Sequence, residues 1–218
     1  MCFSASASFV TAGITGAIGI VALTRVKEPR EVPLAVTPLL FAFQQSIEGL
    51  LWLSLPLTPD GSLAVALTVI YLFFAEAFWP LYAPIAVWLI EPQKYRRHFM
   101  VVCFGIGAGV GAYLFWWLYG HPHFATISGG HIVYVTEYRH SDVVGAAYLA
   151  ATGLPLLLSS RRSIVVLGAI ILVGLIVAYI FYWEAFISVW CFFAAAASVA
   201  ILCHFEWSRR SLRPIASA

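Results

Sequence analysis

Charged residues are scarce in this sequence. Asp, Glu, Lys and Arg together make up 10% of the 218 residues, 62% are hydrophobic, and the mean hydropathy is +0.92. Soluble domains carry about 25% charged residues, so this composition excludes a soluble globular protein. The net charge is only +2, and the cations fall into short separate clusters, which excludes an extended nucleic-acid-binding surface.

Lysine and cysteine are also rare, and their positions exclude further classes. The only lysines, Lys27 and Lys94, lie between apolar stretches, so no intramembrane lysine is available for a retinal Schiff base. Four cysteines make no disulfide framework in a chain of this length. No basic segment precedes the first apolar stretch, so we expect that stretch to be retained as a helix and not cleaved as a signal peptide. No internal repeat is evident, which gives no support to a transporter built of two equal halves.

Long apolar stretches are abundant. Each is long enough, or nearly so, to cross a hydrocarbon core of ~30 Å as a helix. The sequence therefore predicts an all-α membrane protein, a single seven-transmembrane-helix domain over 1–208 followed by a basic cytoplasmic tail, 209–218. The expected helices are 5–24, 34–56, 63–90, 99–119, 142–158, 163–183 and 185–207.

The cations indicate how the chain crosses the membrane. Eleven of the twelve Lys and Arg residues follow the first, third, fifth and seventh stretches: Arg25, Lys27, Arg30, Lys94, Arg96, Arg97, Arg161, Arg162, Arg209, Arg210 and Arg213. Short loops rich in Lys and Arg stay on the cytoplasmic side. This pattern predicts an outer N-terminus and an inner C-terminus, with Arg139 as the only cation on the outer side.

One sizeable segment between the expected fourth and fifth helices is not helical. Within this outer loop, 120–141, two β-prone runs flank Gly129 and Gly130. A Gly-Gly pair between such runs predicts a short β-hairpin. We expect the hairpin to cover the outer helix ends as a lid.

Glycine and proline residues predict special features in two of the expected helices. The expected fourth helix has two overlapping GxxxG pairs, formed by Gly105, Gly107, Gly109 and Gly111. Such pairs serve close helix contact, within one bundle or in a homodimer, and they can also open a ligand groove. In the expected third helix, Pro80 and Pro84 should produce a bend just past Glu76.

Two acidic residues, Glu48 and Glu76, lie within expected membrane spans. Polar groups there are costly and often functional. Gln44, Gln45 and Glu48 share one helix face, which should point into the bundle. The acids are either protonated carboxyls that only join helices, or groups that bind, handle protons or catalyse. The neighbouring pocket is expected to include Gln44, Gln45, Trp79, Trp190 and Cys191.

A metal site is a further hypothesis for the outer side. Its expected ligands are Cys2, His140, Asp142 and Glu184, because His, carboxylate and thiolate bind zinc- or copper-type ions. No HxxxH or HExxH motif places two imidazoles on one helix face, so the outer histidines are alternatively ordinary surface groups. Cys2 is alternatively an unremarkable chain end or a disulfide partner of Cys191.

Three short motifs carry a family resemblance. They are Met1-Cys2-Phe3-Ser4, the Gln44-Gln45 pair followed by Glu48-Gly49 and Trp52, and Trp190-Cys191-Phe192-Phe193. Together they resemble a bacterial integral-membrane family of unknown function whose members open Met-Cys-Phe-Ser. The resemblance implies a multi-pass protein of the bacterial inner membrane, and it carries no established activity.

These observations leave two function hypotheses. The first is a metal-dependent hydrolase with a site in the outer half of the bundle, in which a metal-activated water attacks a lipid or small amphiphile. The second is a non-enzymatic transporter or sensor of a small molecule, ion or proton. In the second, Glu48 and Glu76 bind the cargo, and bending at Pro80 provides the mobile step.

Overall fold

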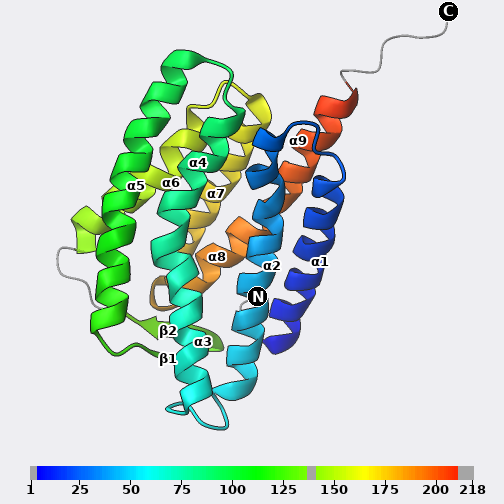
Figure 1. The fold of residues 1–218 in the computed structure, drawn as a ribbon. Coiled ribbons are helices and arrows are strands. Elements are labelled where there is room, and N and C mark those ends of the chain that lie inside the picture. The colour runs from blue at the N-terminus through cyan, green and yellow to red at the C-terminus, as the bar shows by residue number, and fades with distance from the viewer. Residues whose placement is uncertain (1–3, 137–140, 211–218) are drawn as a thin grey trace, which may run out of the picture.

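The computed structural model describes residues 4–136 and 141–210 and is a bundle of long helices (Figure 1). Six helical segments are long and apolar enough to cross a membrane, and a further apolar helix, Asp142–Leu157, is shorter. The chain is therefore a multi-pass membrane protein. The six segments are Ala5–Leu23, Pro29–Ser54, Ser62–Ile90, Lys94–Gly120, Arg162–Phe181 and Trp183–Trp207.

The first two segments form a tightly packed antiparallel pair, α1 (Ala5–Leu23) and α2 (Val32–Ser54), joined through the short η1 (Pro29–Glu31). Small residues allow this close approach. A Cβ on Gly19 would lie 2.6 Å from the Leu39 side chain, and one on Gly49 would lie 2.7 Å from the Phe9 ring. The glycine that follows Glu48 is therefore needed for packing against α1.

The third segment is irregular near its middle. It comprises α3 (Ser62–Leu72), the π-helical turn η2 (Phe73–Phe78) and α4 (Trp79–Ile90). Pro80 has no backbone N–H, so it cannot donate to the carbonyls four and five residues earlier, those of Glu76 and Ala75. The Tyr148 hydroxyl, from α6 (Ser141–Leu157), donates to the Ala75 carbonyl at 2.6 Å instead. The sequence predicted a bend just past Glu76, and the structure has a π-turn there that includes Glu76 itself.

The predicted hairpin is present after α5 (Lys94–Gly120). Strands β1 (Phe124–Ser128) and β2 (His131–Val135) pair antiparallel, and Gly129 and Gly130 adopt φ values of 56° and 77° in the turn. The hairpin packs against α3 and α8 (Phe186–Ala196), with Ile132 fully buried and Tyr134 stacked on Tyr71 at 4.6 Å between ring centroids. It thus covers one end of the helices.

The remaining helices depart in detail from the predicted bounds. α6 (Ser141–Leu157) and α7 (Arg162–Phe181) begin and end within two residues of expectation. The expected helix 185–207 is divided at Ala197 into α8 (Phe186–Ala196), which follows η3 (Trp183–Ala185), and α9 (Ser198–Arg210). α9 therefore continues into the first two residues of the expected tail.

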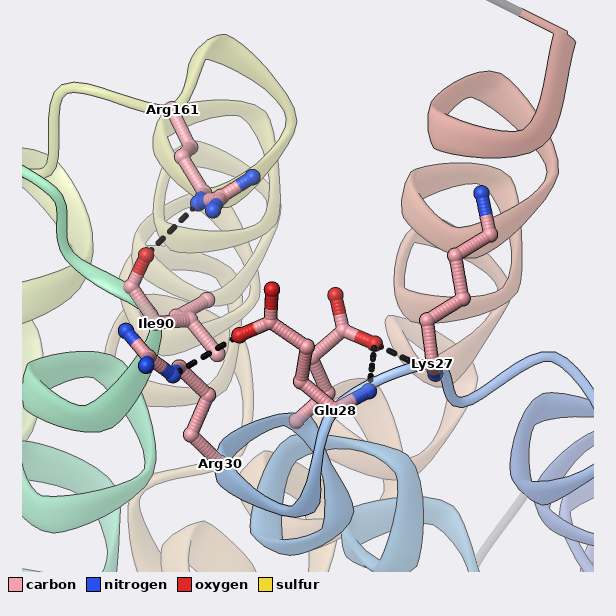
Figure 2. A network of polar contacts seen from close by, with 6 residues as sticks. Lys27, Glu28, Arg30, Ile90 and Arg161 are labelled. Carbon is pink, nitrogen blue, oxygen red and sulfur yellow. Dashed lines mark hydrogen bonds and ion pairs between the residues drawn. The ribbon is translucent and has the colours of Figure 1, made fainter. Parts of the chain in front are cut away.

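The cation-bearing connections meet at one end of the bundle. The α1–α2, α4–α5 and α6–α7 connections lie at the end where α9 finishes, and the α2–α3 loop and the hairpin lie at the other end (Figure 1). At the first end, Arg161 donates from Nε to the Ile90 carbonyl at 2.7 Å, and Arg30 pairs with Glu28 at 2.8 Å (Figure 2). We call this the cation-rich end.

A buried carboxylate connects two of these loops. Glu91, at the end of α4, accepts hydrogen bonds from Ser159 Oγ at 2.8 Å, from the Ser160 backbone N–H at 2.9 Å and from the Ser160 hydroxyl. The Gln93 backbone N–H adds a fourth bond at 3.2 Å. Burial raises the pKa of Glu91, but these donors outweigh it and hold the pKa below its ordinary value of 4.5. The α4–α5 and α6–α7 loops are thereby held together.

Candidate functional site

Buried polar side chains meet inside the bundle, in the half that the hairpin covers. Gln44, Gln45 and Glu48 on α2 are fully buried, as expected for a face that points inward, and Glu76 in the π-turn is 6% exposed. Burial at this depth is costly for amides and carboxyls unless they find partners. Most of their partners come from α4 and α8.

Gln44 connects α2 to two other helices. Its Oε1 accepts a hydrogen bond from Trp79 Nε1 at 2.9 Å, and its Nε2 donates to Cys191 Sγ at 3.3 Å. The Trp79 ring stacks on Phe41 with centroids 4.2 Å apart. Because each of its two amide atoms has a partner, Gln44 fixes the positions of the indole and the thiol.

The two carboxyls lie around the same thiol. Glu48 accepts a hydrogen bond from the Ser188 hydroxyl, one turn before Cys191 on α8. Both Glu48 and Glu76 lie close enough to Cys191 to interact with it electrostatically, and the Tyr71 side chain lies beside it. Cys191 is a free, buried thiol. We call Gln44, Glu48, Tyr71, Glu76, Trp79, Ser188 and Cys191 the polar cluster.

A pocket reaches this cluster from the side of the bundle. Its volume is about 310 Å³, and residues of α6, α7 and α8 form most of its wall, with Phe41 and Trp79 at its inner end. The wall is almost entirely apolar and includes Leu149, Leu154 and Leu172, whose side chains are partly exposed on the outside of the bundle. The polar side chains in the wall are those of Trp79, Tyr148, Thr152, Trp190 and Cys191. Because Trp79 and Cys191 belong to the polar cluster, the pocket adjoins that cluster.

Six of the seven expected catalytic and pocket residues lie at or beside this junction. Trp79, Trp190 and Cys191 line the pocket. Gln44 forms hydrogen bonds with Trp79 and Cys191. Glu48 and Glu76 lie behind the pocket wall, within electrostatic reach of Cys191. Trp190 makes an edge-to-face contact with Tyr148 at 5.5 Å between centroids, and its indole N–H is buried without an acceptor among the described residues.

Gln45 differs from its neighbour. It is fully buried, yet neither side-chain atom has a hydrogen-bond partner in the described part of the chain. It is not part of the pocket wall.

The structure describes two of the four expected metal ligands. Cys2 and His140 lie outside the described residues, and Asp142 and Glu184 are exposed. Across 4–136 and 141–210, no group of three His, Cys, Asp or Glu side chains is placed to hold a metal ion.

The histidines near the hairpin pack against aromatic rings or are buried. His121 stacks on Trp117 with centroids 3.8 Å apart, and its Nδ1 is 3.0 Å from the Trp117 carbonyl. His131 makes an edge-to-face contact with Tyr182 at 5.2 Å. Burial lowers the pKa of His123. His121 and His123 precede β1, and His131 pairs with Ser128 next to the turn.

Three members of the site were not expected from the sequence. Tyr71 and Ser188 contact the cluster, and Tyr148 lines the pocket. Ser188 precedes Cys191 by three residues, a spacing that places both on one helix face. Tyr71 and Tyr148 have no such local signal, because their partners are distant in the sequence.

Comparisons with known proteins place the chain without assigning it an activity. No curated protein and no solved structure matches it. The whole chain, residues 1–218, matches one family, DUF6629, described as a family of unknown function. The protein therefore belongs to this uncharacterised family.

Proposed function

We propose that the protein binds an amphiphilic small molecule of the bilayer in the pocket between α6, α7 and α8. The observation that supports this is a largely apolar pocket of about 310 Å³ whose inner end adjoins buried polar groups. Ligand pockets usually measure about 300–1,000 Å³ and combine apolar walls with a few placed polar groups. An alkyl or ring system would occupy the apolar part, and the polar head would lie against Trp79, Tyr148 and Cys191.

The proposed membrane topology makes the pocket open toward lipid. We take α6 as the seventh span, because the Leu158 carbonyl that follows it accepts a 2.5 Å hydrogen bond from Arg96 at the start of α5, at the cation-rich end. α5 ends beside the hairpin, so α6 returns across the bundle. With the cation-rich end in the cytoplasm, the N-terminus lies outside, and the partly exposed Leu149, Leu154 and Leu172 face the acyl chains.

A second candidate function is transport, favoured by the π-turn next to Glu76. π-turns occur often at functional sites. This one carries Glu76 of the polar cluster and packs against Gly111 of α5, where a Cβ would lie 2.7 Å from the Ala77 carbonyl oxygen. In a transporter, Glu48 and Glu76 would bind the cargo and the π-turn would change its hydrogen bonds between two states. A catalytic role for a zinc- or copper-type ion at Cys2, His140, Asp142 and Glu184 is a separate hypothesis that elemental analysis of the purified protein tests.

Filling the pocket tests the proposed function. Gly153 lines the pocket, and a Cβ there would have no atom within 4 Å. Gly153→Phe should therefore occupy the pocket without a backbone clash. Gly145→Phe is the matched control, because Gly145 lies on the same helix, also has open space around a Cβ and does not line the pocket.

The measurement is the lipid and small-molecule content of purified wild type and both variants, by native mass spectrometry and by extraction. Wild type and Gly145→Phe should retain the same amphiphile, and Gly153→Phe should lose it. Retention by Gly153→Phe, or no retained molecule in wild type, would overturn the proposal.

A further inference from the structure

We infer that the amphiphile bound in this pocket carries a cationic head, a protonated amine or an onium group. This inference rests on the proposed function, because it assigns the chemical class of the ligand that the pocket holds. Three features of the described residues support it.

The first feature is the aromatic lining at the inner end of the pocket. Phe41, Trp79, Tyr148 and Trp190 all contribute to the wall there. Phe41 and Trp79 stack at 4.2 Å, and Tyr148 meets Trp190 edge to face at 5.5 Å. Aromatic faces attract cations through their quadrupoles, most strongly where water is excluded, and aromatic-lined sites recognise quaternary ammonium groups in this way.

The second feature is the pair of acidic side chains behind this lining. Glu76 is next to Ala75, whose carbonyl accepts the Tyr148 hydroxyl, and it lies close enough to both Tyr148 and Cys191 to interact with them electrostatically. Glu48 is also within electrostatic reach of Cys191. A charge acts over a longer distance in an apolar interior than in water. A cation in the pocket would favour the ionised form of these two acids and would then be stabilised by them without direct contact.

The third feature is the placement of the basic residues of the chain. Within the described ranges 4–136 and 141–210, every Lys and Arg lies in a connecting segment or at a helix end. Two carboxyls thus lie deep in the spans while the basic side chains are all near the ends. The two acids would repel an anionic head at this position. A cationic head would supply a positive charge that no described Lys or Arg places inside the bundle.

The test compares two probes of the same shape and opposite charge, tetraphenylphosphonium and tetraphenylborate. Binding to wild-type protein in nanodiscs is measured by equilibrium dialysis, in excess of protein-free nanodiscs of the same lipid. We expect wild type to bind the phosphonium at least about tenfold more tightly, which corresponds to about 1.4 kcal/mol. Equal or tighter binding of the borate, or no phosphonium binding above the empty nanodiscs, would overturn the inference.

Variants locate the charge effect. Glu76→Gln keeps the shape of the side chain and should weaken phosphonium binding about tenfold while leaving borate binding unchanged or stronger. Asp60→Asn removes one negative charge at an exposed position in the α2–α3 loop and should change neither. If Glu76→Gln and Asp60→Asn both bind the phosphonium as wild type does, the carboxyl has no such role.

The two proposals fail separately. Loss of the retained amphiphile in Gly153→Phe, together with no preference between the two probes, would keep the pocket and reject the cationic head. Unchanged amphiphile retention in Gly153→Phe would reject the pocket itself.

Discussion

The backbone of Gly107 on α5 lies directly against the carbonyl oxygen of Pro80 on α4: a Cβ at Gly107 would come within 1.9 Å of that oxygen. Pro84 explains why this carbonyl is available, because the residue four positions after Pro80 has no N–H to donate to it. Gly107 therefore allows α5 to pack against a helix segment whose own hydrogen bonding is interrupted. Glycine Cα–H groups commonly contact carbonyl oxygens at such helix interfaces.

This contact predicts unequal effects for the glycines of α5. Gly107→Ala should lower the free energy of unfolding by about 1–3 kcal/mol, the usual cost of overpacking, because backbone atoms on both sides must move apart. Gly105→Ala is the control, since a Cβ there meets nothing within 4 Å. It should be neutral or slightly stabilising, because alanine favours helix. Thermal unfolding in detergent measures both, and equal destabilisation would contradict the packing described.

The hydrogen bond from Tyr148 to the π-turn predicts a coupling with Pro80. Tyr148→Phe should cost about 1 kcal/mol of stability, because the Ala75 carbonyl loses its donor. Pro80→Ala restores a backbone N–H at that turn, so Tyr148→Phe should cost less in this background. A double-mutant cycle measures the difference. Additive effects would show that the Tyr148 hydroxyl and the new backbone N–H at position 80 do not hydrogen-bond to the same carbonyl.

Glu91 predicts a pH-dependent contribution to stability. Its folded-state pKa is lower than its ordinary value of 4.5. Its contribution should therefore be complete above about pH 4.5 and should be lost as the pH falls through the lowered pKa. Glu91→Gln should cost about 1–3 kcal/mol at pH 7, and the gap to wild type should narrow below pH 4.5.

Unfolding curves of the two proteins from pH 3 to pH 7 measure this gap. Glu28→Gln, at an exposed ion pair with Arg30, is the control and should cost less. A gap between wild type and Glu91→Gln that stays constant across the range would contradict the role given to the carboxylate.

The backbone conformation of the hairpin turn predicts which residues can replace Gly130. Its φ of 77° lies in a region that asparagine tolerates and β-branched residues avoid. Gly130→Val should destabilise the hairpin and expose its protected backbone amides to hydrogen exchange, whereas Gly130→Asn should change exchange little. Equal exchange in both variants would show that the turn does not require this conformation.

Local patterns explain which parts of the fold could be predicted. The helical segments follow from long apolar runs, and the hairpin follows from Gly129 and Gly130 between two β-prone runs. The sequence predicts only a bend near Pro80 and not the π-turn, one of whose partners, Tyr148, lies far away in the sequence. The division of the last segment at Ala197 has no comparable sequence signal.

The site could be predicted only in part for the same reason. Glu48, Glu76 and Gln44 were identified because polar residues are rare in apolar spans. Their arrangement around Cys191 depends on how α2, α3 and α8 pack, which one sequence does not specify. The expected metal site rests only on a shared side of the membrane. The described residues include no group of three His, Cys, Asp or Glu side chains placed to hold an ion, and Cys2 and His140 lie outside them.

Photo-crosslinking in native membranes tests the central claim, the lateral pocket, most directly. The probe is a diazirine-bearing alkylamine, and the labelled peptides are identified by mass spectrometry. We expect labelling concentrated on the pocket-lining residues of α6, α7 and α8, such as Leu149, Leu172 and Ala194, with loss of that labelling in Gly153→Phe and not in Gly145→Phe. Labelling spread evenly over the lipid-facing helices, unchanged in Gly153→Phe, would contradict the account.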